Sequence, residues 1–110
     1  MSNLIYTRNH HVPKQISNII KWAEDRNLIN GSDVKNQTLK LIQEVGELSD
    51  SVCKGKNPID DIGDCMAVLI IIAEQSGLTV QECMEHAWND IKDRKGCMVD
   101  GVFVKESDNA

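Results

Sequence analysis

Two acidic pairs stand out in the sequence because the members of each pair are three residues apart and enclose a glycine. Glu44 and Glu47 lie in LIQEVGELSD, and Asp61 and Asp64 lie in DDIGDCM. Residues three apart share one face of a helix, so each pair sets two like charges side by side. Four carboxylates that converge from neighbouring helices would suit a hard cation with oxygen ligands, such as Mg²⁺ or Mn²⁺. The pattern favours a metal site formed by these four residues.

The same acids also have an ordinary structural explanation. Acidic side chains at the start of a helix interact favourably with its dipole, which would account for the second pair. In the first pair, Glu44 can pair with Lys40 along one helix. Glu47 can pair with Lys54 or face solvent. Spacing alone therefore leaves both a metal site and a solvated acidic face open.

The enclosed glycines, Gly46 and Gly63, give weak support to the metal interpretation. A glycine inside a helix costs about 1 kcal/mol relative to alanine. We expect that cost to be offset, either by close approach of two helices or by room for a ligand.

Four helices are expected to position these residues. Apolar residues recur every three or four positions in four segments, which is typical of one-sided helices. The segments run from about Val12 to Arg26, from Asp33 to Lys54, from near Pro58 to just before Gly77, and onward from Thr79. The middle of the third segment is apolar on every side, as suits the centre of a helical bundle.

Local signals predict where these elements begin and end. Ser32 is a good N-cap for the second helix and Asn57 for the third, and Gly55 is a natural C-terminal stop. The short loop of residues 55–57 should pack the second and third helices antiparallel, which would bring the acidic pairs together. After the fourth helix, CMVDGVFVK predicts two strands around Asp100-Gly101, because Asp-Gly is a preferred type I′ hairpin turn.

Composition narrows the classes of function. The chain has 12 Lys and Arg against 17 Asp and Glu, a formal net charge of -5, so neither nucleic acid nor an anionic membrane is an expected partner. No apolar run reaches the ~20 residues of a membrane span, and no secretory signal or transit peptide is recognised. We expect one cytoplasmic domain over residues 1–110. No C-x-x-C motif occurs, so reduced, buried thiols are expected at Cys53, Cys65, Cys83 and Cys97.

The two acidic segments together resemble the signature of the MazG-like all-α nucleoside triphosphate pyrophosphohydrolases. They read Q-x-x-K-L-x-x-E-x-G-E-L at residues 37–48 and D-D-I-G-D at residues 60–64. The resemblance extends over about residues 15–105 and is to the compact, single-domain members of the family. Within it, Glu44 and Glu47 match the E-x-x-E part of the signature, and Asp64 matches its final Asp.

The sequence departs from that signature at two positions. Gln43 stands where the signature often has its first Glu. Asp61 stands where the signature usually has Glu, so the charge is kept on a side chain one methylene shorter. The departure at Asp61 bears on the geometry of that metal ligand.

The resemblance implies a fold, a cofactor and a reaction. The fold is an all-α, four-helix core with a short C-terminal β-hairpin, assembled as a homodimer or as a dimer-of-dimers tetramer. Mg²⁺, with Mn²⁺ as a possible substitute, would be bound by Glu44, Glu47, Asp61 and Asp64. The reaction would convert a nucleoside triphosphate and water to a nucleoside monophosphate and pyrophosphate, and we favour house-cleaning of the deoxynucleotide pool.

Other side chains are expected to complete such a site. A carboxylate not fully used as a ligand could position or deprotonate the attacking water, and Glu47 is preferred to Glu44 for this role. Basic residues at the end of the fourth helix would bind phosphates, although they also favour a helix C-terminus by themselves. The candidates for substrate binding there are Asn89, Lys92, Arg94 and Lys95. Lys54 and Lys40 are secondary candidates.

Base recognition needs an aromatic face, and the sequence offers few. Trp22 follows the charged side of the first helix and could stack on a base, or it could pack at a subunit interface. Trp88 lies on the apolar stripe of the fourth helix and is expected in the core. A di-iron bundle is disfavoured because no Glu-x-x-His pair occurs. A non-catalytic helical binding or regulatory module, with the acids as a solvated face, is the alternative function.

Overall fold

The computed structural model describes residues 13–106, which belong to two compact units. The first unit, residues 1–80, contains α2 (Lys14–Asp25), α3 (Val34–Cys53) and α4 (Ile59–Gln75). The second unit, residues 81–110, contains nearly all of α5 (Val80–Ile91) and the strands β1 (Gly96–Val99) and β2 (Val102–Lys105). Four helices and a hairpin confirm the mostly helical fold. That the two units form one four-helix domain stays a prediction, and the predicted helix start at Val12 lies outside the described residues.

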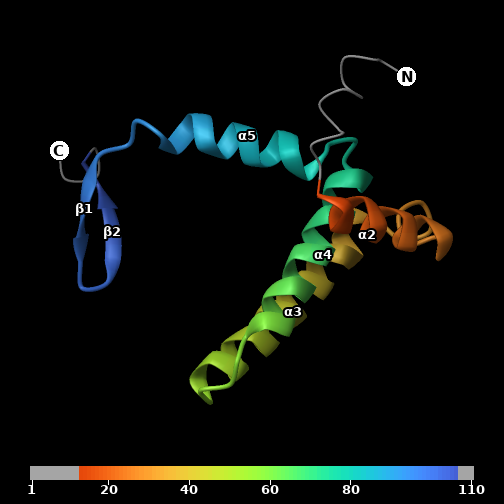
Figure 1. The fold of residues 1–110 in the computed structure, drawn as a ribbon, viewed down its shortest axis with the longest axis horizontal. Helices are drawn as coiled ribbons and strands as arrows, with labels where there is room; N and C mark the ends of the chain where they lie inside the picture. The colour runs from red at the N-terminus through yellow and green to blue at the C-terminus, as the bar shows by residue number, and fades with distance from the viewer. Residues whose placement is uncertain (1–12, 107–110) are drawn as a thin grey trace. The chain divides into compact units, whose positions relative to one another are not determined.

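The helices α3 and α4 run side by side in opposite directions and are joined by a short loop (Figure 1). Gly55 has a φ of +71°, which glycine adopts without steric cost. Its N–H donates to the carbonyl of Val52 at 3.1 Å, and the N–H of Lys56 donates to the carbonyl of Ser51 at 2.9 Å. These bonds satisfy the last carbonyls of α3 and reverse the chain. The predicted stop at Gly55 is therefore confirmed.

The N-cap of α3 is Asp33, so the prediction of Ser32 was wrong. The Oδ1 atom of Asp33 accepts a hydrogen bond from the backbone N–H of Asn36 at 2.7 Å. A carboxylate is a stronger acceptor than a hydroxyl because its charge assists the hydrogen bond. At the start of α4, the Oδ1 atom of Asn57 accepts from the N–H of Ile59 at 3.0 Å. The N-cap of α4 is nevertheless Pro58, so the prediction of Asn57 was wrong by one residue.

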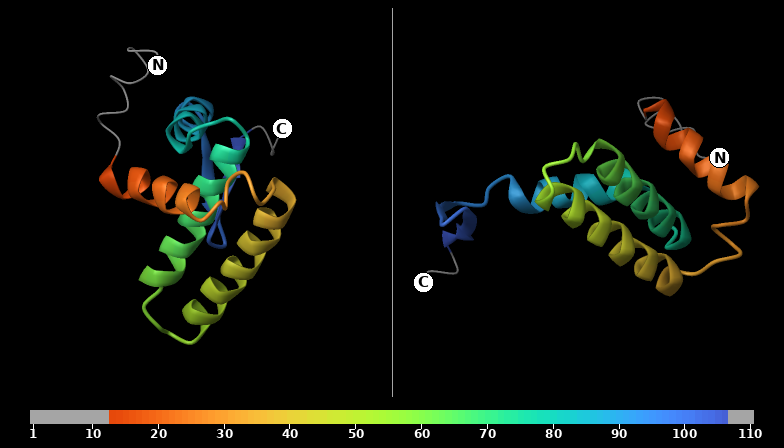
Figure 2. Two further views of the ribbon diagram at one scale, coloured as in Figure 1. Left: turned by 90° about the vertical axis from the view of Figure 1, so that its right-hand side faces the viewer. Right: turned by 90° about the horizontal axis from the view of Figure 1, so that it is seen from below.

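The core of the first unit forms where α4 meets α3 and α2. Figure 2 shows α2 crossing α4 near the end of α4 that lies away from the α3–α4 loop. Gln75 ties the α2–α3 connection to this end, because its Nε2 donates to the carbonyls of Leu28 and Ile29, each at 3.3 Å. The buried apolar residues are Ala23, Val68, Ile70, Ile71 and Ala73.

Part of the surface of α3 and α4 is apolar and exposed. On α4 the exposed residues recur with helical spacing and form one stripe: Ile59, Ile62, Met66 and Leu69. On α3 they include Leu39, Ile42, Val45 and Val52. We expected α4 at the centre of a bundle, but α4 is buried along only part of its circumference. Taken singly, no helix within residues 13–106 is long and apolar enough to cross a membrane, and α4 and α5 reach that limit only when counted together.

The second unit contains the predicted hairpin. β1 and β2 pair antiparallel, with Val99 opposite Val102. Asp100 and Gly101 have φ values of +50° and +82°, positive at both positions as a type I′ turn requires. Trp88, expected in the core, is 58% exposed. Trp88 is exposed because α5 is the one helix among the described residues of this unit, so no second helix of the unit covers its apolar stripe.

The cysteines correct another expectation. All four are free thiols, as predicted. Cys65 is half-buried, but Cys53, Cys83 and Cys97 are exposed. Burial needs a second layer over a helix or strand, and neither unit supplies one at these three positions.

Candidate active site

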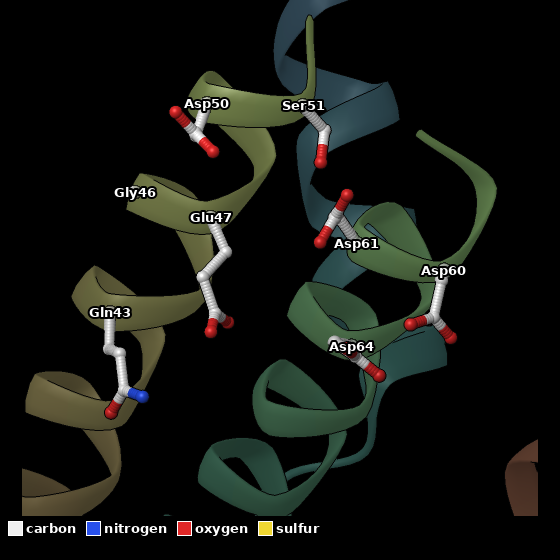
Figure 3. Close-up of a pocket in the computed structure, with 8 residues that line it drawn as sticks. All are labelled: Gln43, Gly46, Glu47, Asp50, Ser51, Asp60, Asp61 and Asp64. Atoms are coloured by element: carbon white, nitrogen blue, oxygen red, sulfur yellow. The ribbon is translucent and has the colours of Figure 1, made fainter. Parts of the chain in front are cut away.

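Residues of α3 and α4 together line an acidic cavity of about 550 Å³. Three predicted metal ligands lie on it, Glu47 from α3 and Asp61 and Asp64 from α4. Figure 3 shows Glu47 and Asp61 extending into the space between the two helices. The polar lining also includes residues that were not predicted for the site: Gln43, Asp50, Ser51 and Asp60.

Two of those additional residues carry charge, and the sequence held a signal for each. Asp50 lies three residues after Glu47, so it extends the helical face already identified on α3. Asp60 lies in the first turn of α4, as expected from the helix dipole. Asp60 also lines the acidic cavity, which was not expected from the helix dipole.

A second cavity of about 450 Å³ adjoins the acidic one, because Asp64 lines both. Its lining is largely apolar and comes from α2, α3, α4 and the α2–α3 connection: Trp22, Leu28, Ala67, Val68 and Ile71. Polar groups are supplied by Gln37, Lys40, Glu44 and Asp64. The structure thus brings three of the predicted ligands to the acidic cavity and places Glu44 on this apolar cavity.

Glu44 is the buried charge of the site. Its side chain is only 9% exposed, and its Oε1 atom lies 3.2 Å from the Nζ atom of Lys40. The predicted Glu44–Lys40 pair is therefore confirmed. The Oε2 atom is buried and has no hydrogen-bond partner among the described residues. Burial of a carboxylate is costly unless its charge is compensated, so one oxygen is paired and the other is able to accept a ligand.

The acidic residues influence one another's protonation. A hydrogen bond between the carboxyl groups of Glu44 and Glu47, which forms only when one of them carries a proton, lowers the pKa of Glu44, and Lys40 lowers it further. The same interaction and the charge of Glu44 raise the pKa of Glu47. Burial raises the pKa of Asp64, and the carboxylate of Asp60 adds to this shift. Glu47 is therefore the member of the first pair that binds a proton more readily.

The four predicted ligands suit a hard divalent cation. They are negatively charged, and carboxylate oxygens are the ligands that Mg²⁺ and Mn²⁺ prefer. In the part of the chain that the structure describes, no three Asp, Glu, His or Cys side chains are grouped closely enough to hold one ion as they stand. Like charges on neighbouring turns repel. Glu47 and Asp64 are exposed, which leaves their side chains room to rotate toward one ion.

The predicted phosphate-binding residues lie in two places. Lys54 of the first unit pairs with Asp50 at 2.9 Å, so the suggested Glu47–Lys54 pair was wrong. In the second unit the Nη2 atom of Arg94 lies 2.7 Å from Asp90, and Arg94 helps to line a cavity of about 430 Å³ with mixed charge. A triphosphate-binding role stays a prediction for the four candidates of this unit, Asn89, Lys92, Arg94 and Lys95.

Trp22 presents an aromatic surface to the apolar cavity and is 48% exposed. The guanidinium carbon of Arg26 lies 4.6 Å from the centroid of the Trp22 ring, a cation–π contact. The Nη1 atom of Arg26 also donates to the backbone carbonyl of Trp22 at 3.2 Å. An aromatic ring therefore lies on the cavity next to the carboxylates, where the prediction of base stacking needs one.

The glycines of the two acidic segments are not explained by close helix packing. A Cβ atom added at Gly46 or at Gly63 would meet nothing within 4 Å. Gly46 lines the acidic cavity, whereas Gly63 lines neither of the two cavities described above. Of the two explanations considered, room for a ligand is the one that the surroundings of Gly46 still allow.

A phage protein is similar to part of this chain. The chain is 48% identical over 63 residues to an uncharacterized 18.2 kDa protein of the rep-hol intergenic region of Haemophilus phage HP1 (strain HP1c1). The match covers 56% of this chain and spans 39% of the length of that relative. No family model matches the chain, and no solved structure matches it. The function of this chain is therefore inferred from its residues and their geometry.

Proposed function

We propose that this chain is a divalent-metal-dependent nucleoside triphosphate pyrophosphohydrolase of the MazG-like type, with house-cleaning of deoxynucleotides as its role. Two adjoining cavities support the proposal. One is lined by carboxylates, the other is largely apolar and includes Trp22, and Asp64 belongs to both. A nucleoside triphosphate has the same two parts, a polyanionic chain that needs cations and a flat base that needs an apolar surface.

The observation that carries the proposal is the buried carboxylate of Glu44. Acidic residues on a solvated helix face need no ligand, because water compensates their charge. The Glu44 side chain is only 9% exposed, and its Oε2 atom has no hydrogen-bond partner among the described residues. A carboxylate in that state is stabilised by a bound cation. This favours a ligand site over the alternative of a non-catalytic module with a solvated acidic face.

Mg²⁺ is the proposed cofactor, with Mn²⁺ as a substitute. Glu44, Glu47, Asp61 and Asp64 would hold it, in keeping with the family signature that these residues resemble. When bound, the ion neutralises triphosphate charge and lowers the pKa of the attacking water. A chain with a formal net charge of -5 needs such local cations to bind a polyanion.

Glu47 is assigned to the attacking water. Its carboxyl group faces the acidic cavity, and its pKa is raised by the neighbouring Glu44, so it accepts a proton more readily than an ordinary glutamate. The water oxygen forms a bond to one phosphorus of the anhydride between the α- and β-phosphates, and the bond from that phosphorus to the bridging oxygen breaks. The bridging oxygen leaves with the other phosphorus, so the products are the nucleoside monophosphate and pyrophosphate, and the proton of the water passes to Glu47.

Self-association is part of the proposal. The apolar stripe of α4, Ile59, Ile62, Met66 and Leu69, is exposed in the single chain. Contiguous exposed apolar side chains are typical of interaction surfaces. A homodimer, or a dimer of dimers, would cover this stripe and would agree with the assembly that the resemblance implies.

A direct assay tests the proposal. The protein is incubated with canonical and damaged nucleoside triphosphates, in ribose and deoxyribose forms, with and without Mg²⁺. We expect nucleoside monophosphate and pyrophosphate in equal amounts from at least one nucleotide, and loss of the reaction when the metal is chelated. If correctly folded protein releases no pyrophosphate from any nucleotide, the pyrophosphohydrolase proposal is wrong and the non-catalytic module is favoured.

A further inference from the structure

We infer that Lys40 is a built-in counter-ion that holds the buried carboxylate of Glu44 until a divalent cation takes its place, and that Lys40 then binds the phosphate chain of the nucleotide. The inference depends on the proposed function, because it assumes a cation site that includes Glu44. It assigns to Lys40 two successive partners, first a carboxylate and then a phosphate.

The first observation is the position of Lys40. Among the residues that line the acidic and the apolar cavities, Lys40 is the one basic side chain. Its Nζ atom lies 3.2 Å from the Oε1 atom of Glu44. The side chain of Lys40 is about half exposed, whereas that of Glu44 is buried. Lys40 is thus the partner that is able to move, and Glu44 is the partner that stays.

The second observation is that Lys40 and a cation would compete for the same carboxylate. A divalent ion bound to Glu44 would lie within a few ångströms of the Lys40 ammonium group, and two positive charges at that distance repel. The lysine side chain has a flexible four-carbon stem, so the ammonium group can turn away while its stem keeps its place on the apolar cavity. A triphosphate lying beside the cation would offer the displaced ammonium group a new anionic partner.

Another helix supplies a matched control. Lys21 pairs with Asp25 on α2 at 3.0 Å with the same four-residue separation, and neither residue lines the acidic or the apolar cavity. Both side chains of this second pair are well exposed, at 74% and 55%. An exposed ion pair contributes little to stability. Removal of Lys21 therefore removes one positive charge without leaving a buried carboxylate unpaired.

The first measurement is Mn²⁺ binding to the nucleotide-free protein, by calorimetry or by electron paramagnetic resonance. Lys40→Met should bind Mn²⁺ about tenfold more tightly than the wild type, because the competing ammonium group is gone. Lys21→Met should stay within about threefold of the wild type. Without metal, the thermal midpoint of Lys40→Met should fall, because Glu44 is left buried and unpaired. Mn²⁺ should raise that midpoint by more than it raises the wild-type midpoint.

The second measurement is binding of an uncleavable nucleotide, a deoxynucleoside triphosphate with a methylene bridge between the α- and β-phosphates, at saturating Mn²⁺. Lys40→Met should bind this analogue about tenfold more weakly, because a charge-assisted phosphate contact is lost. Lys21→Met should bind it as the wild type does. Tighter metal binding with weaker nucleotide binding is the signature of exchange, since a lysine with a purely structural role would not change the two affinities in opposite directions.

The outcomes separate this inference from the proposed function. If the wild type binds neither Mn²⁺ nor the analogue, the proposed function fails and the inference fails with it. If the wild type binds both but Lys40→Met binds Mn²⁺ no more tightly than Lys21→Met does, only the counter-ion role is overturned. Unchanged affinity for the analogue overturns the phosphate contact. If Lys40→Met does not fold, Lys40→Gln keeps the length and polarity of the side chain without its charge and must show the same opposed changes.

Discussion

Glu47 of α3 and Asp61 of α4 line one acidic cavity from opposite sides of the space between two antiparallel helices (Figure 3). The pKa of Glu47 is raised chiefly by Glu44 on its own helix and, to a smaller extent, by Asp61 across that space. The chain reversal at Gly55 makes this proximity possible, because it returns α4 along α3. The two carboxylates can therefore be tested as parts of one site.

Replacement of Glu47 by glutamine should remove the proton acceptor and keep the shape of the side chain. We expect Glu47→Gln to lower the rate of pyrophosphate release by about 10²- to 10⁴-fold, the usual contribution of a general base. Circular dichroism should show unchanged helical content. The control is Glu24→Gln, an exposed position on α2 that lines neither cavity and should keep the wild-type rate. A Glu47→Gln protein as active as this control would rule out Glu47 as the base.

Neighbouring aspartates on α4 should differ in their importance. Asp60 and Asp61 both line the acidic cavity. Only Asp61 stands at a ligand position of the signature that the sequence resembles, where Glu is usual. We expect Asp61→Asn to raise the Mg²⁺ concentration needed for half-maximal rate by about tenfold or more. Asp60→Asn should change it by less than about threefold. Equal effects in a Mg²⁺ titration would mean that the cavity acts through its total charge rather than through specific ligands.

The two helical glycines should respond alike in stability and differently in activity. A Cβ atom has open space at Gly46 and at Gly63, so each alanine variant should be more stable by about 0.5–1 kcal/mol in chemical denaturation. Gly46→Ala adds a methyl group to the lining of the acidic cavity and should lower kcat/KM, whereas Gly63→Ala should leave it unchanged. Full activity of Gly46→Ala would show that the glycine is not needed to make room for a ligand.

Trp22 should affect substrate binding more than the chemical step. Base–aromatic stacking contributes about 1–3 kcal/mol, so Trp22→Ala should raise KM roughly tenfold with a smaller change in kcat. Trp22→Phe keeps a flat ring on the apolar cavity and should retain most of the affinity. If the alanine variant changes oligomeric state in sedimentation and leaves KM unchanged, Trp22 packs at a subunit interface instead.

The exposed stripe of α4 should mediate self-association. Sedimentation of the wild type should give the mass of a dimer or a tetramer. Ile62→Lys places a charge in the middle of the stripe and should shift the protein toward the monomer by at least about tenfold in dissociation constant. Ile62→Val keeps the surface apolar and should preserve the assembly. A wild-type protein that is monomeric at high concentration would contradict this prediction.

The sequence by itself determined the local structure and the list of acidic candidates. Apolar spacing located four helices, Gly55 ended α3, and Asp-Gly set the hairpin turn, because each of these features depends on residues close together in the chain. The three-residue spacing placed Glu44 and Glu47 near each other on α3 for the same reason. The N-cap of α3 was nevertheless predicted incorrectly. Asp33 and Ser32 are both good caps, and the stronger acceptor of the two is the one in use.

Only the tertiary structure decided what each helical face meets. Spacing shows which residues share a face of one helix, but the rotation of that helix against its neighbour determines which of them become buried. That rotation buries Glu44 beside Lys40 on an apolar cavity, while Glu47 joins Asp61 and Asp64 on the acidic one. It also leaves the stripe around Ile62 exposed, although the middle of α4 is apolar on every side. Burial depends on these contacts between helices, so it could not be predicted from spacing along the chain, whereas the pKa shifts of Glu44 and Glu47 arise chiefly from neighbours within α3.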